Sequence, residues 1–523
     1  MSFLVEQKIR GKTYIYEAES YWDKEKKQSR QRRRYVGVKD MATGEVSRPR
    51  GAGHHTKLCL DFGVGHCVRA LAGELELDKC LAKALGDEDA AAALALAAYA
   101  ATEDKALYLF QDWAESNWGM GSAALGSQDV SRLLERLGAD DASRGLFWKL
   151  WARRHGSGGN VAFDITSISS YGGLQGFQEF GHNRDGESLP QVNVGLALNG
   201  ASGLPLGYRL HPGSVTDVTT LRNLLAYLKG DLRADVDRLV LDRGFHSLKN
   251  LIDLNASGIP FLMPVPLGTK VAAALLKAAA RALRRPSSAV LAGGRAVCHF
   301  SKSVNVAGAR LMGHVYLDRA READELARLM RKLALVESEV NGKPHGDAGE
   351  VAESVDRLAP GLSELFAVEL KDGKAMLTRD LAAIDARAGR FGRIALLDSS
   401  KAEGAEKPLE DYLRRDSVEK VFDSLKSEMD SGRAQIHSQA ALEGRLFVFM
   451  LGLVMRSAMM ARLAKSELDG KLTFPEVVCA LKRLRVAIQS DGVARLLEVT
   501  KKQRGIFAAL GVAEPLELPP GTP

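Results

Sequence analysis

The chain has 523 residues, with 72 Lys plus Arg against 65 Asp plus Glu, and its formal net charge is +7. Hydrophobic residues make up 46% of the chain, which is enough for packed cores and excludes global disorder. The length predicts roughly two to four domains. Five cysteines without a CxxC pair argue against a disulfide framework and a structural zinc site, so we expect a protein of the reducing cytoplasm. The longest apolar runs are shorter than the roughly 20 residues that cross a bilayer, so we expect no membrane partner.

The first 50 residues carry six of the seven net positive charges. Residues 3–38 alternate polar and apolar on both sides of a charged hinge at 23–34, which predicts a β-hairpin with a basic tip. Cations beside aromatic rings suit a nucleic-acid contact, because cations bind phosphate and rings stack on bases. A charged tip that serves only solubility is the alternative. The candidate DNA contacts in this segment are Arg30, Arg32, Arg33 and Arg34.

The spacing of apolar residues changes from helical to strand-like near residue 159. Residues 71–154 are rich in Ala and Leu at helical spacing, which predicts an all-helical segment. Three strand-like runs then follow, NVAFDIT, QVNVGLALN and LPLGYRLH, and after them a helix, DRLVLD, a second helix and IPFLMPV. This order predicts an α/β fold with a mixed sheet flanked by helices.

The second half of the chain breaks this rhythm. Residues 266–400 contain an Ala-rich helix and short strands, so we expect an α+β insertion there. Helical spacing returns at 408–431, 439–468 and 474–497, which predicts three further helices before a Pro-rich tail.

Two aspartates occupy similar places in the predicted sheet. Asp164 follows the apolar run VAF and Asp242 follows LVL, so each is expected where a buried strand ends. Because ligands of α/β sheets gather outside strand ends, the two carboxylates could share a cation. A turn or capping role is the alternative for each of them.

A charged stripe is predicted on the helix EDYLRRDSVEKVFDSLKSEM. At about 100° per residue, its members fall within a stripe about 60° wide. They are Tyr412, Arg415, Glu419 and Lys426. The apolar face of the same helix adjoins the stripe, so we expect the stripe at the edge of a buried surface. An ordinary solvated face with (i, i+4) ion pairs is the alternative.

The spacing Tyr-x2-Arg-x3-Glu-x6-Lys is similar to the Tyr-Arg-Glu-Lys signature of DDE transposases from bacterial insertion sequences. Other blocks resemble the same family in the same order: FDITSIS, GHNRDGESLPQVNVGLALN, GLPLGYRLHPGSVTDVTTL and VLDRGFHS. The likeness covers residues 159–432 and is looser at both ends of the chain. The resemblance implies an RNase H-like fold, with an insertion before the helix that carries Glu419.

The resemblance also implies roles for individual residues. Asp164, Asp242 and Glu419 would be the catalytic triad and would hold two Mg²⁺ ions, which Mn²⁺ could replace. Two such ions, roughly 4 Å apart, stabilise the attacking and leaving oxygens of a phosphodiester. The candidate DNA contacts around them are Tyr412, Arg415, Lys426 and Arg243. For Arg243, a structural ion pair is the alternative.

From these observations we expect five regions. They are a basic N-terminal DNA-binding segment (1–55), a helical N-terminal domain (56–155), an RNase H-like catalytic domain (156–265 and 401–465), an insertion subdomain (266–400), and a C-terminal helical region with a tail (466–523).

The expected function is that of a DNA transposase. It would bind the terminal inverted repeats of its insertion sequence and catalyse Mg-dependent strand cleavage and strand transfer. We expect double-stranded DNA as its partner, a homodimer or higher multimer, and no nucleotide cofactor, since the chain has no GxxxxGK[ST] loop. The alternatives are a non-catalytic DNA-binding derivative and a metal-dependent DNA nuclease without strand transfer.

Overall fold

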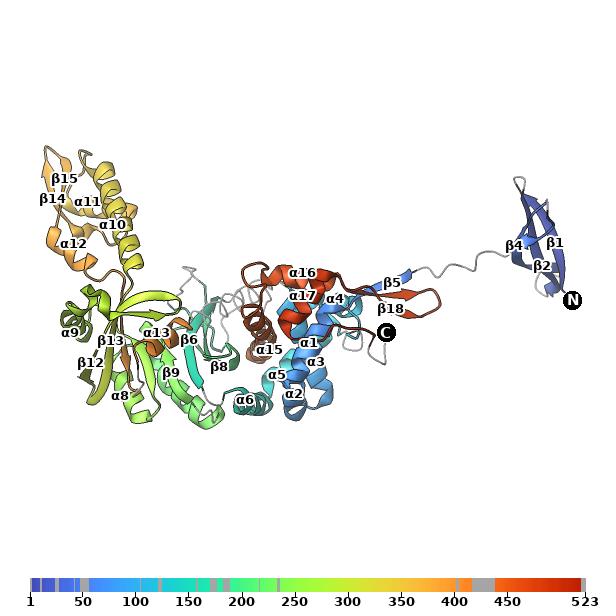
Figure 1. The fold of residues 1–523 in the computed structure, drawn as a ribbon, viewed down its shortest axis with the longest axis horizontal. Helices are drawn as coiled ribbons and strands as arrows, with labels where there is room; N and C mark the ends of the chain where they lie inside the picture. Colours follow the sequence, from blue (N-terminus) through green and yellow to red (C-terminus); the bar gives the residue numbers. More distant parts are fainter. Residues whose placement is uncertain are drawn as a thin grey trace.

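The structure is a computed structural model of the chain. It describes residues 2–9, 12–23, 28–41, 43–47, 56–103, 105–120, 125–156, 159–169, 176–181, 189–215, 217–232, 236–400, 404–415 and 438–518. In Figure 1, a small N-terminal sheet stands apart from the rest of the molecule, and the large mixed sheet lies toward the opposite end.

The N-terminal sheet is antiparallel, with strand order β1-β2-β3-β4 among the described residues. Its strands are β1 (Ser2–Ile9), β2 (Lys12–Asp23), β3 (Gln28–Lys39) and β4 (Val46–Ser47). The predicted hairpin is present as β2 and β3, but pairing extends to Asp23 and Gln28. The charged hinge predicted at 23–34 is therefore wrong, because residues 28–34 lie within β3 and pair with β2.

The large mixed sheet has nine strands among the described residues, and its first half matches the predicted order. The elements are β6 (Gly159–Ser169), β7 (Gln191–Asn199), β8 (Pro205–Pro212), α7 (Asp217–Ala226), η3 (Tyr227–Leu232), β9 (Val236–Leu241), α8 (Leu248–Ser257) and β10 (Phe261–Pro264). Their spatial order is β8-β7-β6-β9-β10. β6 is antiparallel to β7 and parallel to β9, because two hairpin connections precede a helical crossover. This is the mixed sheet of an RNase H-like fold.

The inserted stretch is divided between this sheet and a second body. Four of its strands continue the sheet beyond β10, in the order β16-β13-β12-β11. They are β11 (Ala289–Ala292), β12 (Arg295–Val306), β13 (Ala309–Leu317) and β16 (Arg393–Asp398), and α9 (Lys270–Ala279) packs beside them. The short turns η5 (Ala282–Arg284) and η6 (Pro286–Ser288) connect α9 to β11.

The second body of the insertion has its own apolar core, which includes Leu333, Val336, Val351 and Val355. It contains α10 (Arg319–Val340), α11 (Ala348–Leu358), η7 (Ser363–Leu365), β14 (Phe366–Lys371), β15 (Lys374–Arg379) and α12 (Leu381–Ala388). Figure 1 shows it projecting from the far end of the sheet.

The helical N-terminal region packs against the C-terminal part of the chain. Its elements are β5 (Thr56–Asp61), α1 (Gly63–Glu74), α2 (Leu77–Leu85), α3 (Asp87–Thr102), η1 (Leu107–Leu109), α4 (Phe110–Ser116), α5 (Ser127–Ala139) and α6 (Asp141–His155). The C-terminal elements are α15 (Gln439–Leu463), α16 (Phe474–Lys482), β17 (Arg485–Gln489), β18 (Ala494–Leu496) and α17 (Lys501–Leu510). β17 pairs with both β5 and β18, so the two regions form one body.

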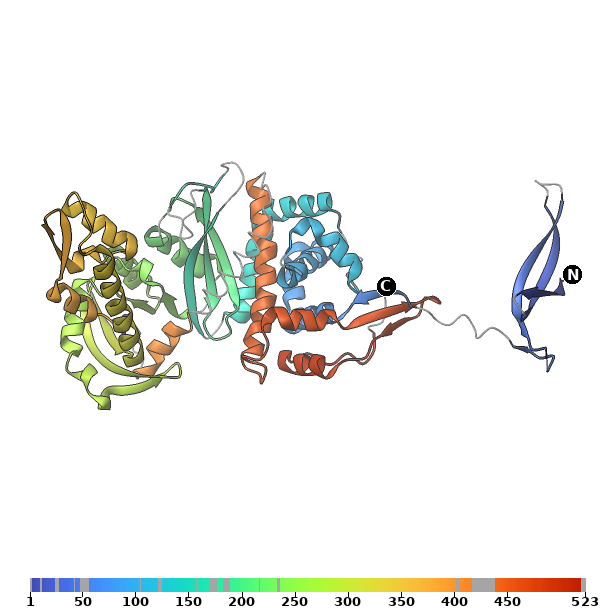
Figure 2. The same ribbon diagram turned by 90° about the horizontal axis from the view of Figure 1, so that it is seen from above.

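Helix α15 lies between the catalytic sheet and the N-terminal helices, as Figure 2 shows. It is long and apolar enough to cross a membrane, but most of it is buried inside the protein. The apolar run from Leu446 to Met455 lies within this helix and is buried.

The helix predicted at 474–497 is wrong beyond Lys482. There the chain turns into β17 and β18, and Gly492 has a positive φ of 85° in the connection between them. The run RVAIQ can serve as helix or strand, and its partner β5 lies more than 400 residues earlier in the chain. Local spacing could not reveal that pairing.

Two glycines allow α5 and α15 to cross closely. A Cβ on Gly138 would overlap the Ala440 carbonyl oxygen, and one on Gly444 would overlap the Leu134 carbonyl oxygen. We expect Gly138→Ala to destabilise the protein by about 1–3 kcal/mol, because the two helices must separate. Calorimetry would show a lower melting temperature.

Gly145 provides a matched control for this substitution. It lies inside α6, and a Cβ there would meet no atom within 4 Å. Gly145→Ala should stabilise the protein by about 0.5–1 kcal/mol through helix propensity alone. Equal melting temperatures for Gly138→Ala and the wild type would contradict the close crossing.

Candidate active site

The two predicted aspartates occupy adjacent positions on neighbouring parallel strands. The last residue pair between β6 and β9 is Phe163 with Leu241, so Asp164 and Asp242 come next on each strand. Asp242 follows the end of β9, as predicted. Asp164, however, lies in the middle of β6, because that strand continues to Ser169 through its pairing with β7. Only the β9 side of β6 is open at Asp164.

The two carboxylates differ in exposure. Asp164 is buried, and its Oδ1 accepts a hydrogen bond of 2.8 Å from the Ile165 N–H. The Asp242 side chain is 28% exposed. It precedes the one-turn helix η4 (Arg243–Phe245), and its carbonyl oxygen accepts the Phe245 N–H at 3.2 Å. One carboxylate is therefore held inside the sheet, and the other faces solvent at its edge.

Arg415 joins the two aspartates. Its Nη1 donates to Asp164 Oδ2 at 3.0 Å, and its Nη2 lies 3.4 Å from Asp242 Oδ1. The Arg415 side chain is 8% exposed. The ring of Tyr412 lies beside it, with the guanidinium carbon 5.6 Å from the ring centre. Both carboxylates thus face one cation, and this cation belongs to the chain itself.

The predicted helix of the Tyr-Arg-Glu-Lys stretch ends early in the described structure. Helix α13 (Glu406–Leu413) contains Tyr412, whereas Arg415 lies just beyond it. The Arg415 N–H donates to the Tyr412 carbonyl at 3.1 Å, a tightened (i, i−3) turn that is common at helix ends. Tyr412 and Arg415 are therefore not spaced as on one continuous helix. Glu419 and Lys426 lie outside the described residues.

The remaining candidates lie on the surface. Arg243 is exposed beside Asp242, and among the described residues it has no ion pair, so the alternative of a structural pair gains no support. The candidate arginines of the N-terminal segment are all exposed on β3 of the separate sheet: Arg30, Arg32, Arg33 and Arg34.

Asp164 and Asp242 have the chemistry of a Mg²⁺ or Mn²⁺ site. Carboxylate oxygens are the hard ligands that these ions prefer, and the two side chains already converge on a positive charge. Within the described part of the chain, no group of three or more His, Cys, Asp or Glu could hold a metal ion. The predicted third ligand, Glu419, is not in that part. The donor set therefore fits such an ion as far as it is described.

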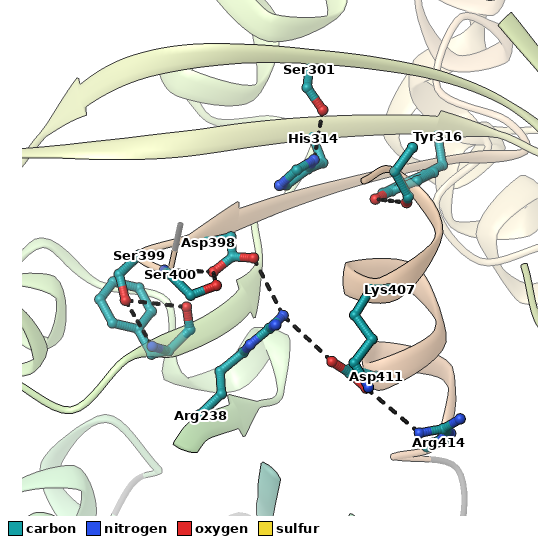
Figure 3. Close-up of polar contacts among 12 residues, drawn as sticks. Arg238, Ser301, His314, Tyr316, Asp398, Ser399, Ser400, Lys407, Asp411 and Arg414 are labelled. Carbon is teal, nitrogen blue, oxygen red and sulfur yellow. Dashed lines mark hydrogen bonds and ion pairs between the residues drawn. The ribbon is translucent and has the colours of Figure 1, made fainter. Parts of the chain in front are cut away.

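A buried charge network holds α13 against the sheet, as Figure 3 shows. Arg238, on β9, lies between the carboxylates of Asp398 and Asp411, with its Nη1 3.3 Å and 3.5 Å from one Oδ2 of each. Asp398 ends β16, and Asp411 belongs to α13; both side chains are 1% exposed. Burial raises the pKa of Asp398, although Ser400 and Arg238 act in the opposite direction. One arginine therefore links three elements of the domain.

This network positions the residues of the site. Arg238 lies on β9, four residues before Asp242, and Asp411 lies four residues before Arg415. Lys407 and Arg414, also on or next to α13, pair with Asp411 as well, with their nitrogens 3.1 Å and 3.7 Å from its Oδ1. Sequence analysis missed the network. The available signal was Asp398, which follows the apolar run IALL as Asp242 follows LVL.

His314 lies on β13, close to this network (Figure 3), and is 2% exposed. Its Nδ1 is 2.6 Å from Ser301 Oγ, which is also 2.6 Å from His299 Nε2. Burial is the main cause that lowers the pKa of His314 to about 4, and the charges of His299 and Arg238 are smaller causes. His314 is therefore neutral in the folded protein at pH 7.

This lowered pKa predicts a loss of stability in acid. The unfolded chain binds a proton at His314 near pH 6.5, but the folded chain does so only near pH 4. The contribution of neutral, buried His314 to the free energy of unfolding is therefore complete above pH 6.5. It decreases by up to about 3 kcal/mol as the pH falls toward 4. Between pH 7.5 and 4.5, calorimetry should show a smaller fall in melting temperature for His314→Gln than for the wild type. Equal falls would contradict this.

Comparison with known proteins extends these observations. The family model described as "Transposase DDE domain" matches residues 156–455, which is more than half of the chain. The chain belongs to this family. Its fold, an RNase H-like sheet with flanking helices, and the general chemistry of DNA transposition follow from that membership.

One solved structure among the matches is the piggyBac transposase in a synaptic complex with hairpin DNA. It is 11% identical to this DDE transposase chain, with a TM-score of 0.37, and the match covers 81% of this chain and 70% of that one. No curated protein sequence matches.

Proposed function

We propose that this DDE transposase binds the terminal inverted repeats of an insertion sequence, cuts DNA there with Mg²⁺, and joins the freed ends to target DNA. The observation that carries the proposal is the pair Asp164 and Asp242, which lie at adjacent positions of the sheet and converge on one cation. Two carboxylates so placed are suited to hold a divalent cation at a phosphodiester.

In this proposal Asp164, Asp242 and Glu419 hold two Mg²⁺ ions, which Mn²⁺ can replace. When bound, such ions lower the pKa of water and neutralise charge on the attacking and leaving oxygens. The Ile165 N–H keeps the Asp164 carboxylate in place, and the surrounding sheet keeps bulk water from its buried side. The partly exposed Asp242 faces the side from which DNA can approach.

The reaction has two displacements at phosphorus. In the first, a water oxygen bonds to phosphorus, the bond from phosphorus to the 3′ oxygen breaks, and the leaving oxygen takes up a proton. In the second, the freed 3′-hydroxyl oxygen bonds to a target phosphorus and gives up its proton. The bond from that phosphorus to the 3′ oxygen of the target strand breaks, and the leaving oxygen takes up a proton. We propose that Arg415, Arg243, Lys426 and Tyr412 contact the phosphates and terminal nucleotides near this site.

The N-terminal sheet is proposed to bind the element ends. Arg30, Arg32 and Arg34 alternate with other residues on β3, so their side chains share one face of the sheet, and all three are exposed. Replacing the three with Ala should weaken binding to element ends. The slope of the logarithm of the binding constant against the logarithm of salt concentration should become shallower by up to about 3, since each phosphate contact contributes about 0.9. Fluorescence anisotropy at several salt concentrations would measure both.

A matched control removes the same charge from another surface. Arg328, Arg331 and Lys332 are exposed on α10 of the insertion. Their triple Ala variant should bind element ends with the wild-type salt slope. If both triple variants bind DNA equally weakly and show equally shallow salt slopes, DNA binding depends on overall charge and not on the N-terminal sheet.

We further propose a homodimer or higher multimer on double-stranded DNA, because two element ends must be brought together. No nucleotide cofactor or membrane is proposed, and the cytoplasm is the proposed location.

The test uses the purified full chain with a labelled duplex that carries an element end, an unlabelled target duplex and Mg²⁺. Nicking followed by joining supports the transposase. Nicking without joining favours a nuclease, and specific binding without either favours a non-catalytic derivative.

A further inference from the structure

We propose that Arg415 is an exchangeable counterion of the metal site: it holds Asp164 and Asp242 together until a divalent metal ion enters, and then moves to a DNA phosphate. This inference rests on the proposed function, because it assumes that the two aspartates are metal ligands.

The first support is the set of atoms that Arg415 engages. Its two terminal nitrogens face Asp164 Oδ2 at 3.0 Å and Asp242 Oδ1 at 3.4 Å, one nitrogen on each carboxylate. A metal ion shared by these aspartates needs carboxylate oxygens at about 2.0–2.6 Å. The Arg415 guanidinium therefore lies between the two carboxylates, in the place where a shared ion would lie.

The second support is charge. Arg415 carries one positive charge and is 8% exposed, so solvent screens it poorly. A divalent ion beside the same oxygens would repel the guanidinium at short range, and in such surroundings that repulsion is strong. The two cations therefore compete, and metal entry requires the guanidinium to leave.

The third support is the way the surrounding chain is held. The backbone before Arg415 is fixed by α13, whose Asp411 pairs with Arg238 and whose Leu409 lies in a buried cluster with Val240 and Leu262. The Arg415 side chain has several rotatable bonds, so it can turn while this backbone stays in place. An arginine released beside a metal-bound phosphodiester can form a bidentate contact with phosphate.

The exchange couples metal binding to DNA binding. DNA phosphate competes with the carboxylates for Arg415, so bound DNA should raise metal affinity, and bound metal should raise DNA affinity by the same factor. Arg415 would then keep the site poorly loaded with metal until DNA is present.

The test measures the Mn²⁺ dissociation constant of the full chain by electron paramagnetic resonance, with and without an element-end duplex. Without DNA, Arg415→Gln should bind Mn²⁺ about 5- to 150-fold more tightly than the wild type, which is the usual range of such coupling. Adding DNA should tighten Mn²⁺ binding in the wild type and change it little in the variant. The control is Arg328→Gln, which removes the same charge from an exposed side chain on α10 of the insertion, and it should behave like the wild type.

Loss of Arg415 leaves two carboxylates facing each other, and their repulsion destabilises the folded state. A second measurement therefore shows whether the variant is folded. Mn²⁺ should raise the melting temperature of Arg415→Gln more than that of the wild type, because a ligand stabilises the state it binds. Arg415→Lys keeps the positive charge but has a single terminal nitrogen, which cannot contact both carboxylates as the guanidinium does. Its Mn²⁺ affinity should lie between those of the wild type and Arg415→Gln.

The outcomes separate the two proposals. Suppose that wild-type Mn²⁺ binding depends on Asp164 and Asp242, but Arg415→Gln binds Mn²⁺ no more tightly than the wild type. This result overturns the exchange and leaves the proposed function standing. Mn²⁺ binding that is the same in Asp164→Asn and Asp242→Asn as in the wild type overturns the metal site, and the exchange with it.

Discussion

Asp164→Asn and Asp242→Asn should each lower Mg-dependent strand cleavage by at least about 10³-fold, which is on the order of 4 kcal/mol of transition-state stabilisation. An amide has nearly the shape of the carboxylate but no negative charge, so it binds a divalent ion poorly. Binding to element ends should persist, because neither substitution removes a cation. Cleavage of a labelled duplex and anisotropy of the same duplex would measure the two effects.

Asp237→Asn is the matched control for this prediction. Asp237 is exposed on β9, five residues before Asp242, and lies away from the carboxylate pair. Its substitution should leave cleavage unchanged. Undiminished cleavage by either Asp164→Asn or Asp242→Asn would show that the chosen carboxylates are wrong, and a similar loss on Glu419→Ala would extend the site to the third predicted ligand.

Arg238→Met should destabilise the catalytic domain by about 3–5 kcal/mol. It removes the only charge that lies between Asp398 and Asp411 among the described contacts in Figure 3, and both carboxylates are almost fully buried. Breaking a buried pair from one side leaves uncompensated charge on Asp398, whereas Asp411 still has Lys407 and Arg414 beside it. Calorimetry should show a large fall in melting temperature, and cleavage should fall as well, because α13 carries Tyr412 and leads to Arg415.

Two controls identify the cause. Arg222→Met breaks an ion pair with Asp253 in which the arginine is 63% exposed, and it should cost at most about 1 kcal/mol. Combining Arg238→Met with Asp398→Asn removes both charges of that buried pair, leaves Asp411 with Lys407 and Arg414, and should recover much of the lost stability. If the double variant is less stable than Arg238→Met alone, the pair does not act through its charges.

The sheet was largely predictable from the sequence. The order of strands and helices predicted the mixed sheet, and the continuous apolar run of β9 matches a buried strand. Polar and apolar residues alternate in β7, which is typical of a half-buried strand, but every residue of β7 is buried. The proximity of Asp164 and Asp242 also followed, because each comes after a buried run. Their adjacent register did not, since it depends on pairing between strands that are far apart in the sequence.

What local spacing could not predict depends on tertiary contacts. The insertion was expected to be separate, yet β11, β12, β13 and β16 extend the catalytic sheet, because edge strand β10 offered unpaired backbone groups. Arg415 was expected to contact phosphate, and its contact with both aspartates could not be deduced from a helical stripe. The roles of Glu419 and Lys426 remain predictions.

A crystal structure of the full chain grown with Mn²⁺ tests the central claim most directly, because Mn²⁺ is located by its anomalous scattering. The account predicts an anomalous peak within about 2.0–2.6 Å of carboxylate oxygens from both Asp164 and Asp242. It also predicts that Arg415 has turned away from them. A peak only at other residues, or no peak with Arg415 still bridging the two aspartates at saturating Mn²⁺, would contradict it.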